Sequence, residues 1–108
     1  MPVTNYEIDR YYIYQYNEDI SGFTAQINCQ HGNSTRAVFQ FYKGGVTPGA
    51  SFKGANTGIL FLRFKENKFR DIIETLRLEK PLSVYFNDDS RLGYLSTSSL
   101  EPIGEEEA

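Results

Sequence analysis

The chain has 108 residues, 40% hydrophobic residues and a formal net charge of −3, a composition typical of one globular domain. Its single cysteine, Cys29, excludes an intramolecular disulfide, and no apolar run approaches the length of a membrane span. The N-terminal residues lack the apolar segment of a signal peptide. We therefore expect a cytoplasmic protein that has no contact with a membrane.

Acidic residues are absent from the stretch 20–65, since all 14 Asp and Glu residues lie outside it. The same stretch contains five basic residues and therefore has a net charge of +5. Such segregation of charge within one chain indicates an interaction surface. The basic residues are Arg36, Lys43, Lys53, Arg63 and Lys65.

The last residues of the chain have the opposite charge. Residues 98–108 contain several glutamates and no basic residue. Acidic terminal segments of this kind are usually solvated rather than packed. We expect one globular domain over 1–97, followed by an acidic, disordered tail over 98–108.

Three strands are predicted in the first part of the chain, which is rich in the aromatic residues that favour sheets. Alternating apolar residues predict strands over 6–16, 23–29 and 35–42. Tyr12 and Tyr14 lie on the same face of the first strand because side chains in a strand alternate. The short turns between these segments predict an antiparallel meander.

A glycine-rich loop is predicted over 43–58, and loops of this length are usually functional or disordered. A fourth strand is predicted over 59–64, followed by a helix over 66–78 with Asn67 as a plausible N-cap. The helix has one apolar stripe with the spacing of a helical face that packs on a core. The stripe consists of Phe69, Ile72, Ile73 and Leu76.

Two further strands are predicted over 82–86 and 91–96, separated by turn residues. The order is therefore four strands, one helix and two strands. This order predicts an α+β fold, with a curved, mainly antiparallel sheet of about six strands and one amphipathic helix packed on it.

Residues that could carry catalysis are few. Cys29 and His31 are two residues apart, but a zinc site needs four ligands, and no recognisable group orients the histidine as a general base. The glycines of Gly45–Gly54 do not match a phosphate-binding loop. The acidic pairs Glu18–Asp19 and Asp88–Asp89 lie in segments that are predicted to be turns, where aspartate is favoured because its side chain hydrogen-bonds to the nearby backbone. We expect no enzyme activity, no metal and no cofactor.

A single-stranded nucleic acid is the alternative ligand that the sequence raises. Proteins that bind single strands combine exposed aromatic residues with a basic track, and the acid-free stretch 20–65 offers both. Its aromatic residues nevertheless do not have the offsets of an RNA-recognition motif, and the acidic tail opposes binding.

A binding or self-assembly module is the function that the sequence favours. Tyrosine is enriched in protein interfaces because its ring is large, rigid and amphipathic. A sheet with one helix leaves its second face open, so a homodimer or a protein partner is expected to cover it. The candidate binding residues are Tyr12, Tyr14, Arg36, Lys43 and Lys53.

The C-terminal part of the sequence, KPLSVYFNDDSRLGYLSTSSLEPIGEEE, resembles a group of small bacterial proteins with no assigned function. The resemblance covers the strand–turn–strand segment Leu82–Ser96 and the tail Glu101–Glu107. It implies a small bacterial domain and brings no catalytic or binding residues with it.

Overall fold

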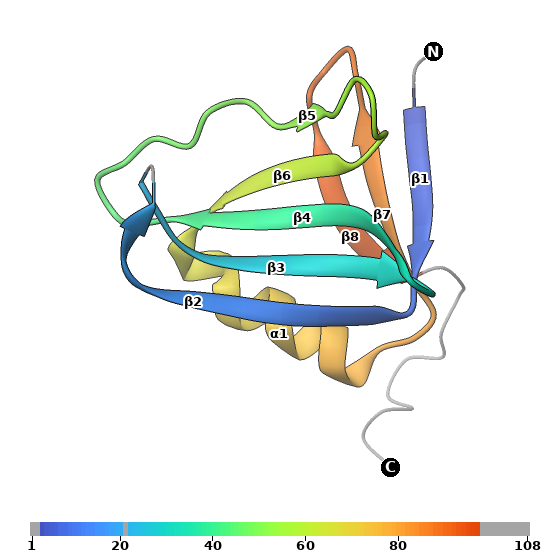
Figure 1. Ribbon diagram of the computed structural model, residues 1–108, viewed down its shortest axis with the longest axis horizontal. Coiled ribbons are helices and arrows are strands. Elements are labelled where there is room, and N and C mark those ends of the chain that lie inside the picture. Colours follow the sequence, from blue (N-terminus) through green and yellow to red (C-terminus); the bar gives the residue numbers. More distant parts are fainter. Residues whose placement is uncertain (1–2, 21, 98–108) are drawn as a thin grey trace.

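The computed structural model describes residues 3–20 and 22–97 of the chain. These residues form eight strands and one α-helix, which confirms the predicted α+β class (Figure 1). The predicted tail 98–108 lies outside the described residues. The strands are β1 (Val3–Ile8), β2 (Arg10–Ile20), β3 (Phe23–His31), β4 (Ser34–Tyr42), β5 (Phe52–Lys53), β6 (Leu60–Lys65), β7 (Leu82–Asn87) and β8 (Gly93–Thr97).

The strands are divided between two sheets, whereas the sequence predicted one. The larger sheet has the order β2-β3-β4-β6-β5, and the smaller sheet has the order β1-β7-β8. The division arises at Asp9, where the predicted strand 6–16 is interrupted. Residues before Asp9 pair with β7, and residues after it pair with β3, so one sequence segment contributes to both sheets.

The larger sheet is mixed rather than purely antiparallel. The meander β2–β3–β4 is antiparallel as predicted, but β6 pairs with β4 in parallel. A parallel neighbour requires a crossover connection, and the glycine-rich segment 43–58 provides it. This segment includes the short strand β5, which pairs antiparallel with β6.

The helix α1 (Phe69–Leu78) follows a 3-10 turn, η1 (Glu66–Lys68). Its apolar stripe packs as predicted, with Leu76 buried and Phe69 partly buried against the core. The predicted N-cap at Asn67 is wrong, because the helix is preceded by Lys68, which makes no side-chain capping hydrogen bond. No helix within residues 3–20 and 22–97 is long and apolar enough to cross a membrane.

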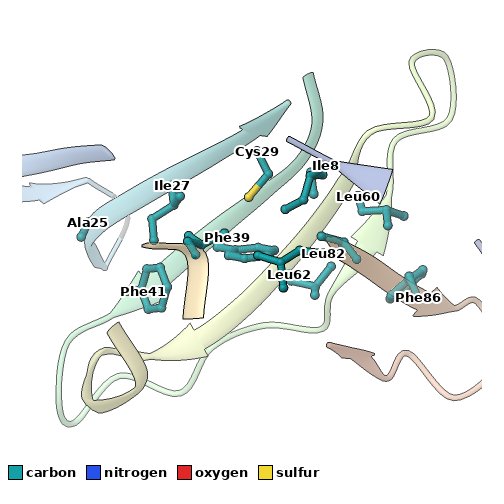
Figure 2. Packing of buried hydrophobic residues seen from close by; sticks show 13 residues of the cluster. Ile8, Ala25, Ile27, Cys29, Phe39, Phe41, Leu60, Leu62, Leu82 and Phe86 are labelled. Atoms are coloured by element: carbon teal, nitrogen blue, oxygen red, sulfur yellow. The ribbon is translucent and has the colours of Figure 1, made fainter. Parts of the chain in front are cut away.

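The hydrophobic core lies between the two sheets and the helix (Figure 2). Alternate residues of β3 and β4, such as Ile27 and Phe39, point into it and are fully buried. Full burial of such a side chain contributes about 1.5–3 kcal/mol to folding. The two sheets approach closely at Gly93, where an added Cβ would lie 2.7 Å from Cγ of Leu62.

Candidate binding face

The two faces of the five-stranded sheet have different surroundings. The inner face packs against α1 and the smaller sheet, and its side chains form the core. On the opposite side, which we call the outer face, no element of the described chain lies over the strands (Figure 1). The outer face is therefore the largest part of the sheet that remains available for binding.

Two rows of side chains cross the outer face, because directly paired residues of neighbouring strands point to the same side of a sheet. Both rows begin on β2 with a tyrosine and continue across β3 and β4 to β6. The first row contains Tyr12, Asn28, Val38, Phe61 and Phe52, and the second row contains Tyr14, Gln26, Gln40 and Arg63.

Tyrosines form a ridge along β2, which we call the tyrosine row (Tyr12, Tyr14 and Tyr16). The rings of Tyr12 and Tyr14 meet edge to face with centroids 5.4 Å apart, and those of Tyr14 and Tyr16 stack at 6.3 Å. Tyr12 and Tyr14 remain 43% and 41% exposed. The row is therefore an aromatic surface held in shape by its own contacts.

A hydrogen bond between the side chains of Tyr12 and Tyr14 changes the acidity of Tyr14. The pKa of Tyr14 is raised above its ordinary value, mainly by the hydrogen bond with Tyr12. Desolvation and the nearby charges of ionised Tyr12 and Tyr16 raise it further. Tyr14 is therefore a neutral hydrogen-bonding group near pH 7.

Amide side chains occupy the middle of the outer face. The Asn28 amide donates to the hydroxyl of Tyr12 over 3.4 Å, and the Gln26 amide donates to Oδ1 of Asn28 over 3.0 Å. Both amides are half-buried. The tyrosine row is thus connected to the centre of the sheet by oriented polar groups rather than by apolar packing alone.

Arg63 lies on β6, in the part of the outer face that is away from the tyrosine row. Its Nε donates to Oε1 of Gln40 over 3.2 Å, and its Nη1 donates to the carbonyl of Ala50 over 3.2 Å. Its guanidinium lies 5.1 Å from the ring of Phe52, which stacks on Phe61 at 4.8 Å. The arginine is therefore anchored in the sheet surface.

The strand β2 forms one edge of the sheet. Within the described chain it pairs with β3 alone, so the backbone along its other edge has no partner strand. Ile13, whose side chain lies on the opposite face from the tyrosine row, is 36% exposed. The three consecutive residues from Tyr12 to Tyr14 are thus all exposed at this edge. An exposed strand edge also presents backbone donors and acceptors for further pairing.

The five candidate residues from the sequence do not form one site. Tyr12 and Tyr14 are neighbours on β2, as predicted. Arg36 lies 5.2 Å from the ring centroid of Tyr6, Lys43 follows β4, and Lys53 donates to Oγ1 of Thr4 over 3.1 Å. Lys53 is on β5, the opposite edge of the sheet from β2, about 19 Å away at ordinary strand spacing.

The acid-free stretch 20–65 corresponds to a contiguous region of the fold. It forms β3, β4, β5 and β6, which are all strands of the larger sheet apart from β2. Gln40 and Arg63 join the site through the parallel pairing of β4 with β6. The sequence did not predict the contact between Gln40 and Arg63, because the crossover between their strands leaves no local pattern. The polar residues at the alternate positions Gln26 and Asn28 were the one signal in the sequence that this face of the sheet carries polar side chains.

Cys29 and His31 lie in different environments. Cys29 is fully buried, and burial raises the pKa of its thiol to about 12, so the sulfur is protonated near pH 7. His31 is exposed, with Nδ1 lying 3.8 Å from Oδ2 of Asp9, whose other oxygen accepts from the Gly32 amide. Within the described residues, no group of three potential metal-ligating side chains is found.

A shallow groove of about 260 Å³ lies where the β1–β2 corner meets the end of α1. Apolar residues such as Ile8 and Leu76 line it together with Arg77, Glu79 and other charged residues. Charges of both signs surround this groove, so it shows no preference for an anionic or a cationic ligand.

Comparison with known proteins found no matching family model, no similar curated protein and no similar solved structure.

Proposed function

We propose that this protein is a non-catalytic binding module that recognises protein through the outer face of its five-stranded sheet. The observation that carries the proposal is the exposed tyrosine row on β2, beside a sheet face that the described chain does not cover. Tyrosine, arginine and amide side chains together make the mixed apolar and polar surface typical of the core of a protein interface.

The charges near the outer face favour protein over nucleic acid as the ligand. Arg63 is hydrogen-bonded to Gln40 and to a backbone carbonyl, so part of its capacity to contact phosphate is already used. Lys53 donates to Thr4, and Arg36 lies over Tyr6. These bases do not follow the tyrosine row as a continuous basic track, which is the usual feature of single-strand binders.

The proposal is tested by removing the two exposed rings with the double variant Tyr12→Ser/Tyr14→Ser. Wild-type protein is expected to associate with protein, seen as self-association in sedimentation or as capture of a partner from a nuclease-treated bacterial extract. The double variant is expected to lose that association.

The matched control for this experiment is Tyr94→Ser, because Tyr94 is 42% exposed and lies on the smaller sheet. This control variant should keep the association. Two results would reject the proposal: no association of the wild type in either assay, or an association that survives loss of both rings on β2.

A weak interaction with single-stranded nucleic acid is the second candidate, supported by the acid-free composition of β3, β4, β5 and β6. Titration of the 15N-labelled protein with a short mixed-sequence RNA tests it. Shifts at Arg63, Tyr12 and Tyr14 that disappear at high salt would favour nucleic acid, since phosphate contacts weaken steeply with salt. Unchanged spectra at low salt would eliminate this candidate.

A further inference from the structure

Acidic residues are almost absent from the strands that form the outer face. From Arg10 to Asn17 on β2, and throughout β3, β4, β5 and β6, the sequence contains no Asp or Glu. The acidic residues of the five strands are Glu18 and Asp19, which follow the part of β2 that pairs in regular register with β3. A basic side chain in the rest of the outer face therefore has no acidic neighbour within the sheet.

Arg63 and Lys65 are the bases that β6 places on the outer face, because they alternate with Phe61. Lys65 is exposed and Arg63 is half-buried. No carboxylate of the described chain lies within ion-pair distance of either one. Glu66, the next residue, accepts a hydrogen bond from the amide of Gly44 instead. Charged groups that are partly removed from water are usually paired, so the guanidinium of Arg63 lacks the anion that such a group normally has.

The sheet holds the guanidinium of Arg63 in one orientation. Of its five N–H groups, one on Nε donates to Gln40 and one on Nη1 donates to the carbonyl of Ala50. The ring of Phe52 lies beside it. The remaining N–H groups, including both on Nη2, have no hydrogen-bond partner within the described residues. They can donate charge-assisted hydrogen bonds to a carboxylate, which are stronger than hydrogen bonds between neutral groups.

The tyrosine row and Arg63 have a spacing that one extended segment can bridge. Tyr14, Gln26, Gln40 and Arg63 are paired in register across β2, β3, β4 and β6. At ordinary strand spacing, about 14 Å separates the strand of Tyr14 from that of Arg63. An extended chain covers this distance with about four residues. The amide groups of Gln26 and Gln40 lie between the two ends, where a polar backbone would pass.

We propose that the outer face recognises an acidic protein segment, with a carboxylate of that segment on Arg63 and an apolar side chain on Tyr12 and Tyr14. This inference rests on the proposed function, because it specifies the chemistry of the protein partner. Charge complementarity identifies the partner, since an oriented and unpaired guanidinium on a face without carboxylates attracts acidic groups and disfavours basic ones. One arginine that already uses two N–H groups suits a single carboxylate better than the regularly spaced phosphates of a nucleic acid.

The test is NMR titration of the 15N-labelled full chain with two synthetic peptides. One peptide is rich in glutamate and carries a single leucine, and the other has glutamine in place of every glutamate. The glutamate peptide is expected to bind at least about tenfold more tightly at low salt, because a hydrogen bond to a charged group is stronger than one to a neutral group. The Nε–Hε signal of Arg63 should shift with this peptide, and the difference between the peptides should shrink as salt rises.

Arg63→Gln is the main variant, and Arg70→Gln is its matched control. Both remove one positive charge, and Arg70 is exposed on α1. The preference for the glutamate peptide should disappear in Arg63→Gln and remain in Arg70→Gln. Lys65→Gln leaves the hydrogen bonds of Arg63 in place, and it should weaken binding by about twofold, because an exposed ion pair contributes little.

Three results would overturn an acidic partner. They are equal affinity of the wild type for the two peptides, a preference that survives Arg63→Gln, and tighter binding of a single-stranded RNA of equal charge at the same residues. A further variant, Glu105→Gln/Glu106→Gln/Glu107→Gln, tests the glutamates of the chain itself. A shift of the Arg63 signal in this variant without peptide would mean that these glutamates occupy the face, which would overturn a separate partner.

Failure of this inference can be separated from failure of the proposed function. If Tyr12→Ser/Tyr14→Ser abolishes association with protein, while Arg63→Gln and high salt leave it unchanged, the partner is not acidic and the outer face still binds protein. If the glutamate peptide binds Tyr12→Ser/Tyr14→Ser with the affinity of the wild type, the tyrosine row is not part of the site and the proposed function fails.

Discussion

The two faces of the five-stranded sheet are formed by the same strands, but their side chains differ in burial and in hydrogen bonding. On β3, Ile27 and Cys29 are fully buried on the inner face, whereas Gln26 and Asn28 on the outer face are half-buried and hydrogen-bonded. Because successive side chains of a strand point to opposite faces of the sheet, one strand supplies both the buried and the hydrogen-bonded residues. The comparison indicates that buried packing is concentrated on the inner face, which leaves the outer face available for the recognition that we propose.

The largest expected effect comes from the centre of the inner face. Phe39 is fully buried and lies 5.5 Å from the ring of Phe64. Phe39→Ala should lower the free energy of unfolding by about 3–5 kcal/mol, because it removes buried surface and leaves a cavity. Urea denaturation followed by circular dichroism measures this. A loss below about 1 kcal/mol would mean that the inner face does not hold the fold.

The contact between the sheets at Gly93 should be the next most sensitive position. Gly93→Ala would bring a methyl group to 2.7 Å from Cγ of Leu62, so we expect a loss of about 1–3 kcal/mol from overpacking. Gly44→Ala is the control, since its added Cβ would have its nearest neighbour at 4.0 Å. Equal urea midpoints for the two variants would contradict the close approach of the sheets.

The pKa of Cys29 gives the inner face a pH dependence. Burial raises the thiol pKa from 9.0 to about 12. Between these two pH values, the thiol loses its proton in the unfolded chain but keeps it in the folded protein. The stabilising contribution is complete below pH 9 and is lost as pH rises toward 12, with a slope of about 1.4 kcal/mol per pH unit.

Urea denaturation of the wild type and Cys29→Ala at a series of pH values isolates this contribution from that of the other titrating groups. The difference in unfolding free energy between the two proteins should be constant below pH 9 and shrink above it. A difference that stays constant throughout would place Cys29 in contact with water.

The smallest effect on stability is expected on the outer face. Tyr12→Ser and Tyr14→Ser should each cost less than about 1 kcal/mol, because both rings are exposed and lose mainly cross-strand contacts. Urea denaturation of each variant beside Phe39→Ala measures the contrast. A cost comparable to that of Phe39→Ala would show that the tyrosine row supports the fold, and the distinction between the two faces would then fail.

Local periodicity was sufficient to predict much of this fold. The stripe from Phe69 to Leu76 predicted the helix and the side that packs on the core, and the alternation around Ile27 predicted the inner face. The interruption at Asp9 was not evident, because residues 6–16 alternate across it. The pairing of β1 with β7, which is distant in sequence, assigns β1 to the second sheet, as in the pair Tyr6 and Val84.

The candidate site was predicted less completely than the fold. The exposed tyrosines follow from the alternation of β2, which is a local property. The separation of Lys53 from Tyr12 depends on strand order, and the contact of Arg63 with Gln40 depends on a parallel pairing across a long loop. Neither has a signature within a short window of sequence.

Amide NMR spectra of the 15N-labelled protein, recorded over a dilution series, test most directly whether the outer face and its edge are the binding surface. Shifts that change with concentration are expected to cluster on β2 and on its outer-face neighbours Gln26 and Asn28. Residues of α1 and of the smaller sheet should remain constant. Concentration-dependent shifts centred on α1 or on β8, with β2 unaffected, would contradict the account.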